Sequence, residues 1–300
     1  MNSRRDFIKK SGIGFAGLLI TPSIFNNVLL DSKQDIGIQL FTVREQLNQD
    51  VKLTLKKIAD IGFKQVETFY GYGDKMSGKG FWGLDAKELA QLLKTYGLKS
   101  GSGHYNTTQY LTDGNTEVLK QQIEVANTLS QKYYTIPAMA PNVRQNGTVD
   151  GYKKMAERFN KAGELCKSHG LTLAYHNHAF EFVPLENKQT GFEILLKETD
   201  VNLVKFELDI FWVVNANVDP ITLFNQNEGR FAMWHVKDMD RNDSKVFTEV
   251  GTGRIDYKTI FENRKLAGNK FIFVEQDIIK KEPFESISQS FNYVKQSLLK

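Results

Sequence analysis

Short apolar runs alternate with longer amphipathic runs from residue 35 to the end of the chain. The short runs are rich in β-branched and aromatic residues, which is typical of buried strands. They begin near residues 36, 65, 99, 133, 171, 203, 231 and 271. The longer runs have apolar residues at helical spacing and predict helices at about 51–59, 86–96, 115–131, 149–168, 191–197, 220–225, 256–266 and 286–299.

This pattern amounts to eight strand–helix units. Their spacing of about 30–40 residues suits one strand, one helix and the two connections between them. Strands that alternate with helices favour a parallel sheet. Eight units without a linker or a shift in composition favour one closed barrel over a doubly wound sheet. We therefore predict an α/β fold, a single (β/α)₈ TIM barrel over residues 31–300.

The first thirty residues have the layout of an export signal. The pair Arg4 and Arg5 is followed by a weakly apolar run over 12–20 and by Pro22. A charged start, a short apolar stretch and a helix breaker are typical of such signals, and paired arginines indicate the twin-arginine type. Residues 1–30 thus predict export to the periplasm, with membrane contact through this segment only. A disordered basic tail is the alternative, and the sequence leaves open whether the signal is cleaved.

Composition and charge narrow the classes of partner. The chain is 41% hydrophobic and 25% charged, as in an ordinary soluble globular protein. The formal net charge is +4, and the first thirty residues carry most of it through Arg4, Arg5, Lys9 and Lys10 against Asp6. The remaining domain is nearly neutral, so it lacks the basic footprint expected for nucleic-acid binding. The single cysteine, Cys166, excludes an internal disulfide and a site with several cysteine ligands. Homo-oligomer formation is compatible with these data.

Titratable side chains gather at the predicted strand ends, where barrels of this class carry their active sites. Four of the five histidines lie there, at positions 104, 176, 178 and 235. Side chains alternate along a strand, and the alternation directs one residue from each of the last four strands into the barrel mouth. These residues are His176, Asp209, His235 and Glu275. Accumulation of polar residues wherever strands end is the alternative reading.

Two imidazoles and two carboxylates make a mixed nitrogen and oxygen ligand set. Such a set suits Mn²⁺, Zn²⁺, Co²⁺ or Fe²⁺ better than Mg²⁺ or Ca²⁺, which favour oxygen ligands. The sequence therefore predicts one divalent metal ion bound by His176, Asp209, His235 and Glu275.

Several motifs resemble those of the xylose isomerase-like TIM barrels, known as sugar phosphate isomerases/epimerases. Their order and spacing carry the likeness, and they span 61–67, 175–178, 208–212, 235–238 and 250–253. The resemblance implies one divalent metal held by the last four strands, and Asp209, His235 and Glu275 match the usual ligands. The fifth strand departs from the pattern, because His176 stands where many members have glutamate. A histidine-rich fifth strand is similar to that of inosose dehydratase-like members.

The resemblance also implies a reaction. We expect a metal-dependent sugar isomerase/epimerase that abstracts a proton next to a carbonyl through a metal-stabilised enediolate. Its substrate would be a small sugar or keto-sugar. The candidate general acids and bases are Glu275, His104 and Lys237. The candidate substrate contacts are His178, Glu67, Glu181, Trp212 and Phe41.

Other interpretations stay open at this point. Without a carboxylate at position 176, the pair of bases used by two-base epimerases is incomplete, which favours a lyase, dehydratase or keto-glycoside-cleaving enzyme as the alternative. His178 and Glu181 could instead orient His176, and Glu67 could be structural. Trp212 and Phe41 could belong to the core. A sugar-binding barrel without activity is a further alternative, whereas an endonuclease would need a basic groove and more metal ligands.

Overall fold

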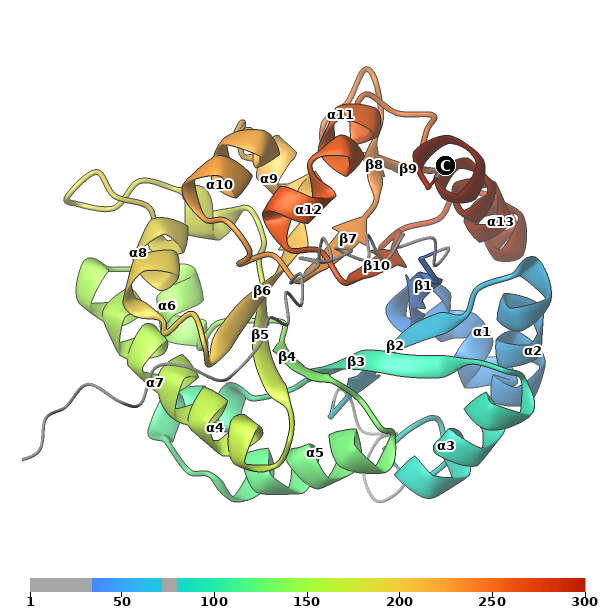
Figure 1. The fold of residues 1–300 in the computed structure, drawn as a ribbon, viewed down its shortest axis with the longest axis horizontal. Helices are drawn as coiled ribbons and strands as arrows, with labels where there is room; N and C mark the ends of the chain where they lie inside the picture. The colour runs from blue at the N-terminus through green and yellow to red at the C-terminus, as the bar shows by residue number, and fades with distance from the viewer. Residues whose placement is uncertain (1–33, 72–79, 300) are drawn as a thin grey trace, which may run out of the picture. The chain divides into compact units, whose positions relative to one another are not determined.

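The computed structural model describes residues 34–71 and 80–299. Eight parallel strands form a closed barrel in the order β1-β10-β7-β6-β5-β4-β3-β2 (Figure 1). Their bounds are β1 Ile36–Gln39, β2 Gln65–Tyr70, β3 Lys99–Tyr105, β4 Tyr133–Ile136, β5 Thr172–His176, β6 Val204–Asp209, β7 Met233–Val236 and β10 Phe271–Val274. The predicted (β/α)₈ barrel is confirmed, and each strand begins within two residues of its expected start.

The barrel closes where its first and last strands meet. Ile38 of β1 is in register with Val66 of β2 on one side and with Val274 of β10 on the other. All three side chains are buried, because parallel strands covered by helices have little contact with water. Closure leaves the barrel without a free strand edge and brings residues far apart in sequence to one mouth.

Helices surround the strands, as Figure 1 shows. The outer helices are α2 Val51–Ile61, α3 Ala86–Thr95, α5 Glu117–Thr128, α7 Val149–Ser168, α8 Gly191–Glu198, α10 Pro220–Gln226, α11 Tyr257–Glu262, α12 Arg264–Ala267 and α13 Pro283–Tyr293. Side-chain caps fix several of their starts: Asp85 accepts a hydrogen bond from the backbone N–H of Glu88, whose carboxylate accepts one from Asp85 in return.

Two expected helices differ from the observed ones. The helix predicted over 256–266 is interrupted at Asn263, which separates α11 from α12. The closing helix starts three residues early, because Glu282 caps it and Pro283 occupies its first turn, where proline is favourable. Its last part, η4 Val294–Leu298, is a π-helix.

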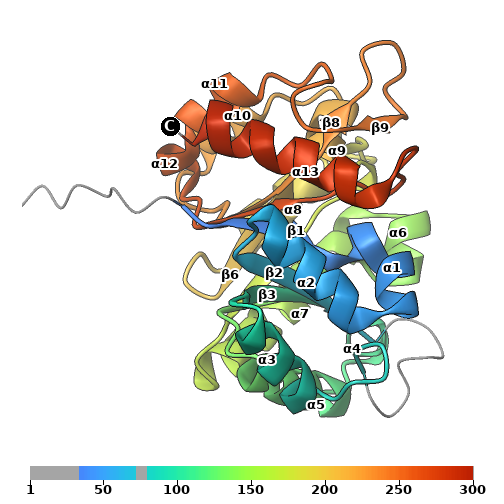
Figure 2. The same cartoon turned by 90° about the vertical axis from the view of Figure 1, so that its right-hand side faces the viewer.

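The loops after the strands contain short elements that the periodicity did not predict. They are η1 Leu40–Val43, α1 Arg44–Gln49, α4 Thr108–Asp113, α6 Pro141–Gln145, η3 Phe180–Phe182, α9 Ile210–Asn215 and the hairpin of β8 Asp238–Met239 with β9 Phe247–Thr248. Each is six residues or fewer, too short for a periodic pattern. In Figure 2 α1, α6 and β9 lie toward the same end of the barrel, which is the end where the strands terminate.

The predicted export signal over 1–30 lies outside the described residues, and so does its consequence for localisation. Within 34–71 and 80–299 we find no helix that is long and apolar enough to span a bilayer.

Candidate active site

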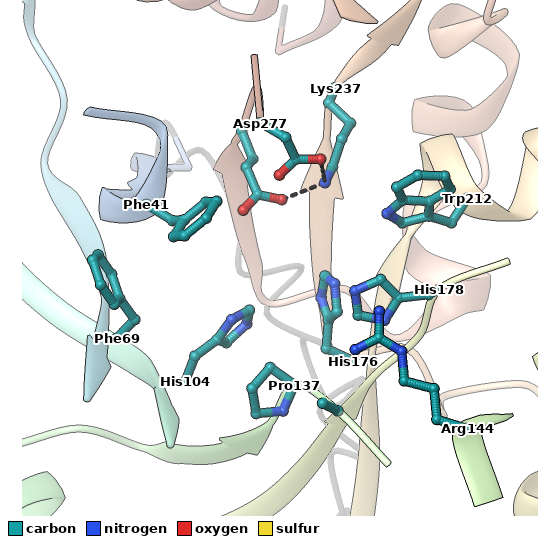
Figure 3. A pocket seen from close by; sticks show the side chains of 12 residues that line it. Phe41, Phe69, His104, Pro137, Arg144, His176, His178, Trp212, Lys237 and Asp277 are labelled. Carbon is teal, nitrogen blue, oxygen red and sulfur yellow. Dashed lines mark hydrogen bonds and ion pairs between the residues drawn. The ribbon is translucent and has the colours of Figure 1, made fainter. Parts of the chain in front are cut away.

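A cavity of about 400 Å³ opens at the C-terminal ends of the strands (Figure 3). Its volume lies within the usual range for small-molecule sites, roughly 300–1,000 Å³. Its lining combines aromatic, basic and acidic side chains: Phe41, Phe69, His104, Pro137, Ala138, Arg144, His176, His178, Trp212, Lys237, Glu275 and Asp277. The predicted barrel mouth is therefore a binding cavity with titratable groups on its wall.

The four predicted metal ligands lie close together at this mouth. His176 ends β5, Asp209 ends β6 opposite His235 of β7, and Glu275 directly follows β10. Nδ1 of His235 is 2.7 Å from Oε2 of Glu275, and Nε2 of His176 is 3.6 Å from Oδ2 of Asp209. Asp209, His235 and Glu275 place ligand atoms within 4.8 Å of one another.

The opposite nitrogen of each imidazole meets a buried glutamate. Nδ1 of His176 lies 3.0 Å from Oε2 of Glu207, and Nε2 of His235 lies 2.6 Å from Oε2 of Glu67. Histidines that bind a metal generally donate their other N–H to such a carboxylate, which fixes the ring and its tautomer. Burial lowers the pKa of His235, but Glu207 and Glu275 outweigh it and hold that pKa well above its usual value, so both ring nitrogens carry a proton without a metal. A metal ion on the nitrogens that face Asp209 and Glu275 would displace the Nδ1 proton of His235, while Glu207 and Glu67 keep the protons on the other nitrogens. The donor set and its surroundings thus fit a divalent metal.

Glu207 is a site residue that the sequence analysis did not select. Its Oε2 is 2.6 Å from Nε2 of His104 and 3.2 Å from Nε2 of His235, in addition to the His176 contact. These four residues form a second group whose possible ligand atoms lie within 4.8 Å of one another. Burial raises the pKa of Glu207, but the neighbouring His235 and His104 outweigh burial and hold it well below its usual range. The available signal was its position two residues before Asp209, on the same strand face.

Lys237 adds a buried positive charge to the ligand set. Its Nζ is 2.8 Å from Oδ2 of Asp209, 2.5 Å from Oε2 of Glu275 and 3.2 Å from Oδ2 of Asp277. Burial lowers the pKa of Lys237, yet the three carboxylates outweigh it and hold that pKa well above its usual value. The side chain is therefore an ammonium ion, and it contacts the same Asp209 and Glu275 oxygens that face the two histidines.

The remaining predicted residues fall into two groups. His104, His178, Trp212 and Phe41 line the cavity, together with Lys237. Glu67 and Glu181 are fully buried and are not among the lining residues.

Both buried glutamates bind neighbouring protein groups. Glu67 also accepts a hydrogen bond from Nε2 of Gln39 at 2.7 Å. Glu181 accepts hydrogen bonds from the Tyr175 hydroxyl and from the backbone N–H of His178, and burial raises its pKa to about 7. Glu67 thus lies beside His104 and His235, and Glu181 lies in the turn that follows β5.

Arg144, Phe69 and Asp277 also line the cavity and were not selected from the sequence. Arg144 comes from the five-residue helix α6, and Asp277 from the loop two residues beyond Glu275. Neither position belongs to a periodic pattern, so no signal in the sequence marked Arg144. Its position two residues after Glu275, just beyond the end of the eighth predicted strand, was the available pointer to Asp277.

The Gly251-Thr252-Gly253 motif surrounds the carboxylate of Asp238. Oδ2 of Asp238 accepts hydrogen bonds from the backbone N–H groups of Gly251 and Gly253, at 2.9 and 3.1 Å. A Cβ atom at Gly253 would lie 2.2 Å from the carbonyl oxygen of Met239. The motif therefore holds the segment that begins with Lys237, and Gly253 is needed for the close approach of the two backbone segments.

Comparison with known proteins agrees with this architecture. Residues 55–295 match the family described as the xylose isomerase-like TIM barrel. The chain belongs to this family. The resemblance inferred from the motifs is thus confirmed over most of the barrel.

Members of the family and its structural neighbours carry out several reactions. The inosose dehydratase of Lacticaseibacillus casei is 29% identical over 168 residues, which cover 49% of this chain and 55% of that protein. The chain spans about half the length of the curated relatives it matches. A sugar phosphate isomerase/epimerase from Parabacteroides distasonis is 25% identical with a TM-score of 0.78, covering 90% of this chain and 96% of that one.

A third likeness concerns the fold alone. The IolI protein, crystallised with a bound zinc atom, is 18% identical with a TM-score of 0.65 and covers 86% of this chain and 96% of its own. The relatives thus include dehydratases and sugar isomerases/epimerases on one scaffold. The relatives named in these comparisons are enzymes.

Proposed function

We propose that this chain is a divalent-metal-dependent sugar isomerase or epimerase that removes a proton next to the carbonyl of a sugar or keto-sugar. One observation carries the proposal: His176, Asp209, His235 and Glu275 converge at the barrel mouth, where His176 and Glu275 line the cavity. Buried glutamates engage the other nitrogen of both imidazoles. These four residues would hold the ion. When bound, the ion supplies positive charge that polarises the substrate carbonyl and stabilises charge developing on its oxygen.

Two cavity residues have the protonation states that proton transfer needs. Burial raises the pKa of Glu275, but Lys237 and His235 outweigh it and hold that pKa well below the usual range, so the carboxylate is ionised, as a metal ligand and a general base both require. Burial lowers the pKa of His104, but Glu67 and Glu207 outweigh it and raise that pKa, which favours the protonated imidazole that a proton donor needs. Lys237, held as an ammonium ion, can hydrogen-bond to a substrate oxygen.

Aromatic side chains give the cavity an apolar wall. Phe41 and Phe69 meet edge to face with ring centroids 5.6 Å apart, and Trp212 lines the cavity as well. Such rings pack against the C–H face of a sugar and exclude water from it. We assign Phe41 and Trp212, together with His178, to substrate binding.

A dehydratase is the second candidate. Curated relatives of the chain include inosose dehydratases. The family resemblance implies that many members have a glutamate where this chain has His176. Removal of the same proton can be followed by loss of a hydroxyl group from the next carbon. His104 or Lys237 would then donate the proton that leaves with that hydroxyl as water.

Solvent exchange distinguishes these outcomes. The Mn²⁺-loaded protein is incubated in D₂O with a panel of ketoses, aldoses and inososes, and the products are followed by NMR. An isomerase or epimerase gives an isomeric sugar in which deuterium replaces one hydrogen and no water is lost. A dehydratase gives an unsaturated ketone and water. Glu275→Gln should abolish exchange, while His169→Ala, at an exposed histidine beyond α7, should not.

Two results would contradict the proposal. One is a purified protein that binds neither Mn²⁺ nor Zn²⁺ in a dialysis titration. The other is exchange at the wild-type rate in both Glu275→Gln and His235→Ala.

A further inference from the structure

Arg144 is the one arginine on the wall of the active-site cavity. Arg144 also lines a neighbouring cavity of about 480 Å³. Pro137 and Ala138 line both cavities. Figure 3 shows Arg144 beside His178, on the side of the cavity away from Phe41 and Phe69. A ligand in either cavity can therefore reach its guanidinium.

Arg144 has no ion-pair partner among the described residues, in contrast to Lys237, although it is near enough to Glu181 to lower the pKa of that carboxyl. Lys237 lies within ion-pair distance of Asp209, Glu275 and Asp277. No carboxylate of the described segments 34–71 and 80–299 forms an ion pair with Arg144.

The surroundings of Arg144 also limit what it can bind within the protein. The guanidinium lies over the ring of Phe180, 5.8 Å from its centroid, in a cation–π contact. The nearby carboxylate of Glu181 is already engaged by the Tyr175 hydroxyl and the His178 backbone. Arg144 is exposed at the cavity mouth, so its N–H groups are open to solvent and can turn to a ligand.

We propose that Arg144 binds a carboxylate of the substrate, so that the cavity takes a sugar acid such as a hexuronate or its keto form. The planar guanidinium matches a carboxylate with two parallel hydrogen bonds. One guanidinium balances one negative charge, whereas phosphate sites usually add backbone N–H groups or a glycine-rich loop. The inference rests on the proposed function in one respect: the sugar ring must occupy the cavity that contains the metal ligands.

Binding measurements test the inference without turnover. Glucuronate, galacturonate, their neutral parents glucose and galactose, and glucose 6-phosphate are titrated into the Mn²⁺-loaded protein by calorimetry. We expect a uronate to bind more tightly than its neutral parent. Arg144→Gln should weaken uronate binding roughly ten- to hundredfold, as expected for loss of a charge-assisted hydrogen bond. It should leave the neutral sugars unchanged, and Arg144→Lys should be intermediate.

The control is Arg241→Gln, which removes an exposed arginine that does not line the cavity. Equal binding of uronates and neutral sugars would overturn the inference, and so would a uronate preference that survives Arg144→Gln. Tighter, Arg144-dependent binding of the sugar phosphate would replace the carboxylate with a phosphate.

The two proposals fail in different ways. Binding that depends on Arg144 without any solvent exchange would reject the isomerase or dehydratase alone. Exchange that is as fast on neutral sugars as on uronates, with uronate exchange indifferent to Arg144→Gln, would reject the sugar-acid assignment alone.

Discussion

Replacement of Lys237 by methionine should tighten metal binding. The ammonium group contacts Oδ2 of Asp209 at 2.8 Å and Oε2 of Glu275 at 2.5 Å, the oxygens that lie toward the histidines. A divalent ion that uses these oxygens must compete with the ammonium ion, and the two cations repel each other. The third partner of Lys237 is Asp277, whose Oδ2 is 3.2 Å from the ammonium nitrogen. Lys237 can turn toward this carboxylate when a metal ion binds to Asp209 and Glu275.

The size of the effect follows from the burial of these groups. Lys237, Asp209 and Glu275 are all at most 5% exposed. Removing one partner of a buried ion pair typically costs about 3–5 kcal/mol, because it leaves an uncompensated charge. Lys237→Met should therefore lower the stability of the metal-free protein by that order. If metal binding recovers about 2 kcal/mol of this loss, the dissociation constant falls roughly thirtyfold.

Competition with a chromogenic chelator measures the Mn²⁺ and Zn²⁺ dissociation constants, and thermal unfolding with and without metal measures stability. Asp277→Asn should act in the opposite sense, since Lys237 then keeps Asp209 and Glu275 as its partners. Lys205→Met is the matched control, because its Nζ donates to the Gly229 carbonyl and not to the site. Weaker metal binding in Lys237→Met, comparable to that of Glu275→Gln, would refute the competition.

Three further changes test other parts of the site. Glu67→Gln removes the carboxylate that orients His235, so Mn²⁺ affinity measured by chelator competition should fall about 10- to 100-fold, with unchanged affinity as the contrary result. Burial raises the pKa of Glu181 from 4.5 to about 7, so its stabilising contribution is complete below pH 4.5 and is lost as the pH rises through 7. Glu181→Gln should therefore flatten the fall in melting temperature between pH 5 and pH 8, and wild-type-like pH dependence would contradict this. Gly253→Ala should cost about 1–3 kcal/mol in urea unfolding because its Cβ would meet the Met239 carbonyl, while a stability equal to wild type would show that the loop adjusts.

Local patterns in the sequence determined the strands and the outer helices. The predicted helix over 149–168 has the observed bounds of α7, and the predicted fourth strand starts at the residue where β4 starts. Strand ends then placed His176, Asp209, His235 and Glu275 at one mouth, because every parallel strand of a barrel ends on the same side. Apolar periodicity and strand polarity are local properties, so they can be read without knowing the contacts.

Only the tertiary structure decided what each of these side chains touches. His104 meets Glu207 across 103 positions of sequence, and His235 meets Glu67 across 168. The short helix that carries Arg144 and the ion pairs of Lys237 likewise follow from the folded loops. Hydrogen bonds and pKa values depend on burial and on charges a few ångströms away, and closure of the barrel is what brings those charges together.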